Sequence, residues 1–154
     1  MQITDIYRYW QKIENNRLGR WLFNFIIPFI NPYTGALKAK VTALRPGFAC
    51  IKLKDRRAIR NHLNSIHAIA LTNLGEFTSG LALISLFTGN MRGIPIEIKV
   101  SFLKKARGML VAECLTQLPD VIDGVEHTVM VNIKDIDNII VAHVTVIWKL
   151  GFYE

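Results

Sequence analysis

The chain has 154 residues and a formal net charge of +7, and 51% of its residues are hydrophobic. This length fits a single domain, residues 1–154, and this hydrophobic share excludes an intrinsically disordered chain. The positive charge favours a polyanionic partner such as nucleic acid, an anionic membrane surface or a phosphate-bearing small molecule. The basic residues fall in short groups and not in one long tail, so a solvated charged face explains them equally well.

The two cysteines, Cys50 and Cys114, form no CxxC pair, and the sequence shows no secretory leader. We therefore expect free thiols and a cytoplasmic location. His62, His127 and His143 show no metal-ligand spacing with one another or with the cysteines, so we expect no metal site.

Residues 1–30 are predicted to form a helical segment that ends before Asn31-Pro32, because a proline disfavours helix at the preceding residue. Apolar side chains recur there at roughly helical spacing, with basic side chains between them. The apolar positions are Trp10, Ile13, Leu18, Trp21, Leu22, Phe25 and Ile26. The run 21–30 is too short to span a bilayer. It either packs on the domain, which we favour, or lies in a membrane interface.

The next part of the chain, residues 36–54, carries a hairpin pattern. Residues 36–44 and 48–54 alternate in polarity on either side of a turn at 45–47. An apolar helix is predicted over 65–87, and four further strands follow it. These strands are predicted at 94–105, 108–118, 127–135 and 139–150. Short turns between strands imply a largely antiparallel sheet of about five to six strands around one central helix, which is an α+β domain with its core at 34–151.

The predicted central helix, "SIHAIALTNLGEFTSGLALISLF", has two unlike faces when plotted at 100 degrees per residue. The bulky face consists of Ala70, Leu71, Leu74, Phe77, Leu81 and Ile84. The small face consists of Ala68, Thr72, Gly75, Ser79 and Ala82. Gly75 and Gly80 each weaken a helix by about 1 kcal/mol relative to alanine, so we expect a packing or ligand requirement for them. Something is therefore expected to approach the helix backbone closely.

The only acid in this helix is Glu76, and a carboxylate in apolar surroundings is costly unless it has a partner or a function. His67 lies nine residues earlier, so the two side chains point to opposite faces, about 13 Å apart along the axis. A dyad within one chain is therefore excluded. If both serve one site, two copies of the helix must meet, which predicts a symmetric dimer.

The motif "RNHLNSIHAIALTNLGE", residues 60–76, places Asn61, His67 and Glu76 six and nine residues apart. In this spacing the chain resembles the hotdog-fold acyl-CoA thioesterases of the PaaI-like group and an uncharacterised hotdog family allied to them. The segments "VSFLKKARGMLVAE", "NPYTGALKAKV" and "LRPGFACIKLKDRRAIRNH" are similar to further parts of these families. The resemblance covers the chain from about Trp21 onward.

The resemblance implies a thioester hydrolase in which Glu76 is the nucleophile or the general base. It also implies that the backbone N–H of Ala68 polarises the carbonyl, while Asn61 and His67 support the site from the other subunit of a dimer or dimer of dimers. The substrate would be an acyl-CoA, with no cofactor. Its phosphates would be met by basic residues, for which the candidates are Arg57, Arg60, Lys104, Lys105 and Arg107.

Two departures from the thioesterase pattern are visible at this site. Ala68 and Ile69 stand where the relatives usually have two glycines, and Glu76 stands where many have aspartate. The amide of residue 68 is retained, but the close approach that glycine permits is lost. These changes bear on rate and substrate and leave the predicted fold unaffected.

Other interpretations stay open. A non-catalytic acyl-CoA or fatty-acyl binding protein would keep the groove and use Glu76 structurally, with Asn73 or a partner's basic group satisfying it. His67 is equally explained as a residue that holds the loop before the helix, and Asn61 as a cap of the turn. A membrane-surface or nucleic-acid protein is disfavoured, because no long basic run or aromatic–basic platform is present. A hydratase of the same fold lacks a strong Asp/His pair.

Overall fold

The computed structural model describes residues 5–120 and 122–153 and contains four α-helices, one short 3-10 helix and six strands in this part of the chain. The α-helices are α1 (Asp5–Ile13), α2 (Arg17–Ile30), α3 (Pro32–Gly35) and α4 (Ala68–Ile84), and the 3-10 helix η1 spans Arg57–Ile59. The strands are β1 (Lys40–Arg45), β2 (Phe48–Leu53), β3 (Met91–Phe102), β4 (Leu110–Leu115), β5 (Glu126–Lys134) and β6 (Ile140–Phe152).

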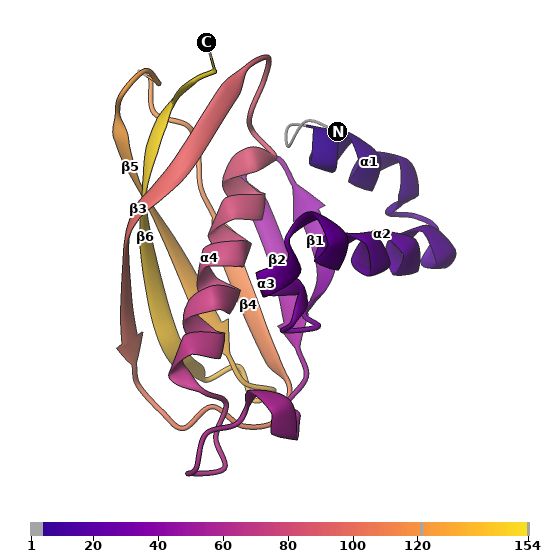
Figure 1. Cartoon of the computed structure of the whole chain (residues 1–154), viewed down its shortest axis with the longest axis vertical. Coiled ribbons are helices and arrows are strands. Elements are labelled where there is room, and N and C mark those ends of the chain that lie inside the picture. The colour runs from indigo at the N-terminus through magenta and orange to yellow at the C-terminus, as the bar shows by residue number, and fades with distance from the viewer. Residues whose placement is uncertain (1–4, 121, 154) are drawn as a thin grey trace.

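The six strands form one antiparallel sheet in the order β1-β2-β4-β5-β6-β3, and α4 lies against one face of it (Figure 1). This confirms the predicted antiparallel sheet around a single long helix. The helix connects β2 to β3 and thereby carries the chain from one side of the sheet to its far edge. The turn between β1 and β2 contains Gly47, whose φ of 72° is the left-handed conformation that glycine adopts without strain.

The small face of α4 packs against β6, as its composition predicts. A side chain at Gly75 would lie 2.5 Å from the Cβ of Val144, so only glycine permits this approach. One turn further on, Ser79 accepts a hydrogen bond of 3.2 Å from the indole nitrogen of Trp148. Ala82 is fully buried. The missing side chains on α4 are therefore a packing requirement, which accounts for the helix propensity lost at Gly75.

The prediction of one continuous helix over 1–30 is wrong for the described part of that segment, and residues 1–4 lie outside the described residues. The chain leaves the helical conformation at Asn16, where φ is −110° and ψ is 122°, and the Asn16 side chain accepts a hydrogen bond from the Leu18 amide. Asparagine favours such capping geometry over a helix interior. The end of α2 at Asn31 agrees with the prediction.

The N-terminal helices pack on the domain, as we favoured from the sequence, but of the apolar positions named there Trp10 alone is buried. Trp10 on α1 and Phe23 and Ile27 on α2 are buried in the core. By contrast, Trp21 and Phe25 are 61% and 53% exposed and stack on each other at the surface. The α2 side chains alone could not indicate this, because both faces of this helix are apolar.

The strands differ from the sequence predictions by a few residues at their boundaries, and among the starts those of β1 and β3 differ most. β1 begins at Lys40 and not at residue 36, because α3 and a turn with Lys38 at φ 53° take up the preceding residues. β3 begins at Met91, three residues before the predicted start. β3 is an edge strand with a bulge between Pro95 and Glu97, and an edge is where a strand tolerates proline.

None of the helices in the described ranges is long and apolar enough to cross a membrane.

The close contact between Gly75 and Val144 predicts a specific pattern of stability. Gly75→Ala should lower the free energy of unfolding by about 1–2 kcal/mol, because overpacking costs more than the helix propensity gained. In a Val144→Gly background the same change should cost little, since the Cβ and both methyl groups that the new side chain would meet are gone. Urea unfolding of the four proteins in this cycle measures the coupling. An equal cost of Gly75→Ala in both backgrounds would contradict the packing explanation.

Candidate functional site

Glu76 lies in the middle of α4, half-buried, with a carboxylate that has no hydrogen bond or ion pair to any described residue. Desolvation by this burial raises the pKa of the Glu76 carboxyl above its ordinary value. The partner considered from the sequence, Asn73, accepts a 3.0 Å hydrogen bond from Thr34 Oγ1 and makes none to Glu76. The burial of the acid therefore has a cost that no neighbouring group in residues 5–120 and 122–153 offsets.

Two cavities meet at the Glu76 side chain. One, of about 380 Å³, lies between α3, α4 and β3 and is lined by polar and apolar groups, among them Tyr33, Asn73 and Ile98. The other, of about 220 Å³, lies between α4, the N-terminal helices and β6, and Trp148 forms part of its wall. The carboxylate thus has room on two sides for a ligand, and apolar walls predominate in the second cavity.

The N-terminus of α4 forms a separate feature. His67 is the N-cap, and its Nδ1 accepts a 3.1 Å hydrogen bond from the Ile69 amide. This is the structural role that the sequence kept open for the histidine. The Ala68 amide makes no hydrogen bond to any described residue, so it is one of the free donors at a helix start, where the helix dipole also favours negative charge.

Ala68 lines a cavity of about 350 Å³ together with three of the other predicted site residues, Asn61, Lys104 and Lys105. The side-chain oxygen of Asn61, Oδ1, accepts hydrogen bonds of 2.9 and 3.2 Å from the backbone amides of Leu63 and Ser65. Asn61 therefore caps the turn before α4, which is the structural role that the sequence left open beside a role in catalysis. Its amide NH₂ group makes no hydrogen bond within the described residues.

The charged groups of the predicted CoA-binding residues differ in whether they already have a hydrogen-bond partner in the described part of the chain. Arg60 donates to Asp55 at 2.7 Å, and this bond lowers the pKa of the Asp55 carboxyl below its ordinary value. Arg107 donates to the backbone carbonyls of two loop residues. The ammonium groups of Lys104 and Lys105 make no ion pair with the described residues and are exposed. Arg57, on η1, is also exposed.

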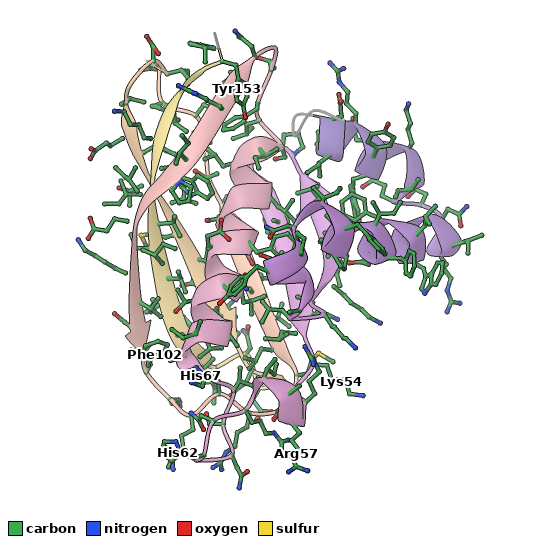
Figure 2. All side chains as sticks on the ribbon, in the orientation of Figure 1. Lys54, Arg57, His62, His67, Phe102 and Tyr153 are labelled. Atoms are coloured by element: carbon green, nitrogen blue, oxygen red, sulfur yellow. The ribbon has the colours of Figure 1, made fainter. Side chains whose placement is uncertain are left out.

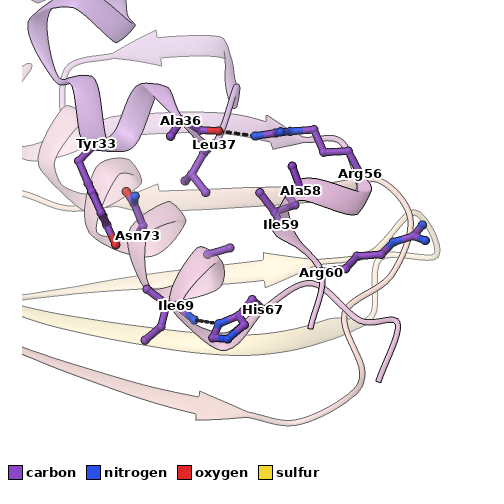
Figure 3. Close-up of a pocket in the computed structure, with 11 residues that line it drawn as sticks. Tyr33, Ala36, Leu37, Arg56, Ala58, Ile59, Arg60, His67, Ile69 and Asn73 are labelled. Carbon is purple, nitrogen blue, oxygen red and sulfur yellow. Dashed lines mark hydrogen bonds between the residues drawn. The ribbon is translucent and has the colours of Figure 1, made fainter. Parts of the chain in front are cut away.

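Figure 2 shows His67, Phe102 and Arg57 at one end of the molecule, with His67 and Phe102 close to the start of α4 and Arg57 further out. A larger cavity, of about 450 Å³, opens beside His67 and is drawn in Figure 3. It is lined by Tyr33 and Asn73 on one side and by Arg56 on the other.

Arg56 was not among the residues predicted from the sequence. Its guanidinium donates to the carbonyl of Ala36, and its Nε is buried without a partner among the described residues. Arg56 is one of three arginines in the stretch 54–62, and nothing in the sequence distinguishes it from the other two.

The structure keeps the two halves of the predicted site apart within one chain. Glu76 lines the two cavities at the middle of α4, whereas Ala68 and Asn61 line the cavity at its start, and the two Glu76 cavities share no lining residue with the third in the described part of the chain. The opposite directions expected for His67 and Glu76 are not confirmed, because the cavity beside His67 shares Tyr33, Ile69 and Asn73 with one of the Glu76 cavities.

The edge strand β3 carries an apolar surface beside these cavities. Ile98, Val100 and Phe102 pair with residues of β6 that face the core, yet Ile98 and Phe102 are 39% and 51% exposed. Because Leu103 donates to the Val141 carbonyl, the backbone groups of these three alternate residues point away from β6. The outer edge of β3 is thus an unpaired strand with apolar side chains, which is the usual template for pairing with another chain.

The antiparallel sheet wrapped around one long helix defines this protein as a hotdog-fold protein, as the sequence resemblance implied. Within this class the chain belongs to the family described as domain of unknown function DUF4442, which matches residues 19–150. A comparison with curated proteins finds no match.

Solved structures with the same fold cover most of the chain. A genomics target designated APC5556 has a TM-score of 0.83 and 24% identity, covering 98% of this chain and 99% of that chain. A protein of unknown function from Pseudomonas aeruginosa, described as a probable thioesterase, has a TM-score of 0.72 and 18% identity over 86% of this chain and 95% of its own. A thioesterase family protein from Silicibacter pomeroyi has a TM-score of 0.72 and 18% identity over 84% of this chain and 96% of its own. These likenesses establish the fold.

The unpartnered Glu76 carboxylate should make stability depend on pH. Between the ordinary and the raised pKa the folded protein binds a proton that the unfolded chain has released, so stability falls as pH rises through this window. Glu76→Gln removes this loss and should therefore be more stable than the wild type at neutral pH. The advantage should shrink on acidification and vanish below the ordinary glutamate pKa of 4.5.

Urea unfolding at a series of pH values measures this difference. Glu97→Gln on the exposed strand β3 is the matched control, because it also removes one carboxylate. A Glu76→Gln protein that is less stable than the wild type at neutral pH, by an amount that shrinks on acidification, would show that the carboxylate has a stabilising partner.

Proposed function

We propose that this protein hydrolyses an acyl-CoA thioester, with Glu76 as general base or nucleophile in a site shared between two copies of the chain. The observation that carries this proposal is the Glu76 carboxylate, half-buried at the junction of two cavities and without a partner in the described residues. A carboxylate with a raised pKa is a stronger base than an exposed one and is thinly solvated. The thioesterase descriptions of proteins with this fold support the same reaction class.

The chemistry needs two groups at opposite sides of the thioester carbonyl. Glu76 would take a proton from water as the water attacks the carbonyl carbon, or would attack that carbon itself. The free Ala68 amide at the start of a partner's α4 would donate to the developing oxyanion, where a helix N-terminus adds favourable partial charge. The carbon–sulfur bond then breaks. In the general-base route the CoA thiolate takes the proton that Glu76 received from water. In the nucleophilic route water hydrolyses the acyl–Glu76 anhydride and supplies the proton of the CoA thiol.

The shared site requires a second chain, and the edge strand β3 is the surface that supports one. Its outward backbone groups and its exposed apolar residues Ile98 and Phe102 lie next to the cavities of α4. Pairing of two β3 strands across a two-fold axis would cover these residues and bring the two α4 helices near each other. A dimer, or a dimer of dimers, follows from this arrangement.

Charge supports CoA as the carrier of the acyl group. Lys104 and Lys105 line the cavity that contains Ala68, and both ammonium groups are exposed. They are therefore free to meet phosphates next to the proposed oxyanion donor. Arg60 and Arg107 are hydrogen-bonded to the loop around 55–65, so they would contribute to CoA binding mainly by stabilising the conformation of this loop.

A non-catalytic acyl-CoA binding protein is the second candidate. The capping roles of Asn61 and His67 favour it, because both residues already have a structural function within the chain. The two candidates differ in turnover, since only the hydrolase releases free thiol.

Glu76→Gln should lower kcat/KM for thiol release by about 10²-fold or more, because it removes the proton acceptor while keeping the size of the side chain. The measurement is thiol release from a panel of acyl-CoAs with a chromogenic thiol reagent. Glu113→Gln is the control, since that carboxylate pairs with Lys134 away from these cavities. Release unaffected by Glu76→Gln would refute the catalytic role, and saturable acyl-CoA binding without release would support the binding protein.

Mixing two inactive variants tests whether the site is shared. Ala68→Pro removes the free amide, and His67 already has the extended φ and ψ of −63° and 142° that a following proline requires. Proline is also favoured at the first position of a helix, so the variant should fold. Co-expressed Ala68→Pro and Glu76→Gln chains should recover about one quarter of wild-type activity, because half of the dimers are mixed and each has one intact site of two.

The control for this experiment is a mixture of Glu76→Gln with the double variant Ala68→Pro/Glu76→Gln, which should stay inactive. If the first mixture also stays inactive although the chains form mixed dimers, Glu76 and the Ala68 amide do not serve one site across the interface.

A further inference from the structure

An apolar groove of about 340 Å³ lies between α1 and α2, away from the start of α4. Ile6 and Ile13 of α1 form one wall, and Leu22, Ile26 and Ile30 of α2 form the other. Among the described residues that line it, only Tyr9 has a polar side-chain atom. Ile26 and Ile30 are 41% and 42% exposed, so the groove presents hydrocarbon surface to solvent within a single chain.

The groove adjoins the smaller cavity at Glu76. Ile6, Ile27 and Ile30 line both, so the groove and the cavity meet at these side chains. Together they form an apolar site, the channel, whose two parts reach from the carboxylate to the outer end of the helix pair. In the inner part, Gly80 leaves space where a side chain would lie 3.3 Å from the Trp148 ring. The Trp148 N–H is already bound to Ser79, so the indole contributes an apolar wall.

Apart from the Tyr9 hydroxyl in the outer groove, the polar side chains of the channel that could meet a ligand lie at one end. Glu76 and Asn31 are at the inner end, and no basic side chain of the described residues lines either part. A ligand that fits has one polar, reactive end next to Glu76 and a long apolar remainder. An aromatic or short acyl group would fill the inner cavity and leave the outer groove empty, whereas an unbranched chain would fill both.

We propose that the groove between α1 and α2 binds the distal carbons of an unbranched medium- or long-chain acyl group whose thioester carbonyl lies at Glu76. This inference rests on the proposed thioesterase function for the position of the carbonyl. It assigns a role to the N-terminal helices, which form the outer half of the acyl site.

Chain-length dependence is the direct test. The wild type is assayed with acetyl-CoA, hexanoyl-CoA and dodecanoyl-CoA, and kcat/KM should rise by roughly fourfold for each methylene that the groove buries. Ile26→Arg places a charge in the outer groove and should lower kcat/KM for dodecanoyl-CoA at least tenfold more than for hexanoyl-CoA. Phe25→Arg is the matched control on the same helix, because Phe25 is exposed and does not line the channel, and it should leave this ratio unchanged.

Binding measured without turnover separates this inference from the hydrolase proposal. Calorimetric titration of Glu76→Gln with the same three acyl-CoAs should show affinity that increases with acyl-chain length. This increase should be lost in the double variant Ile26→Arg/Glu76→Gln. If the wild type hydrolyses none of the three acyl-CoAs but affinity still increases with chain length, the groove assignment stands and the proposed thioesterase function is refuted. If hydrolysis occurs with equal kcat/KM for hexanoyl-CoA and dodecanoyl-CoA, the groove assignment is overturned and the hydrolase stands. The groove assignment is also overturned if Ile26→Arg abolishes binding to anionic phospholipid vesicles but leaves dodecanoyl-CoA binding unaffected. These helices would then contact a membrane surface.

Discussion

Gly75 brings the backbone of α4 against the side chain of Val144 on β6, and this contact fixes the rotation of the helix about its own axis. With the small residues turned toward β6, Glu76 on the next position points toward β3 and the N-terminal helices. Because Ala68 and Glu76 belong to the same helix, the same rotation determines where the Ala68 amide lies at its start. The separation of the acid from the amide donor is thus a consequence of how the core packs, and no local adjustment of either residue would remove it.

Much of this arrangement could be predicted from the sequence because it depends on periodicity. The two faces of α4, the hairpin at β1 and β2 and the order of the later strands all follow from local patterns of apolar and small residues. The distance between His67 and Glu76 follows from helix geometry alone. The roles of individual polar residues could not be predicted, since the cap formed by His67 and the turn closed by Asn61 depend on a loop whose path the sequence does not specify.

The packing of the N-terminal helices could not be predicted from the sequence either. Both faces of α2 are apolar, so composition could not indicate that Phe23 and Ile27 pack inward while Trp21 and Phe25 stay at the surface. The break at Asn16 reverses the chain and lays α1 beside α2, which creates the groove between them. One asparagine cap therefore determines whether residues 5–30 form an extended rod or a two-helix wall beside the acid on α4. The side chains of Ile6, Ile27 and Ile30 link this wall to the core and to the Glu76 cavity at once.

Pro95 has a consequence for the behaviour of the newly made chain. A long strand with a free edge is a hazard during synthesis, because many chains can add to it in any register and grow into aggregates. Pro95 offers no N–H, and the adjoining bulge interrupts the pleat, so only the part of β3 that follows offers a regular edge. A short remaining edge has few registers in which apolar residues of two chains match. Pro95 thus protects the protein from uncontrolled self-association and leaves one short segment for specific pairing.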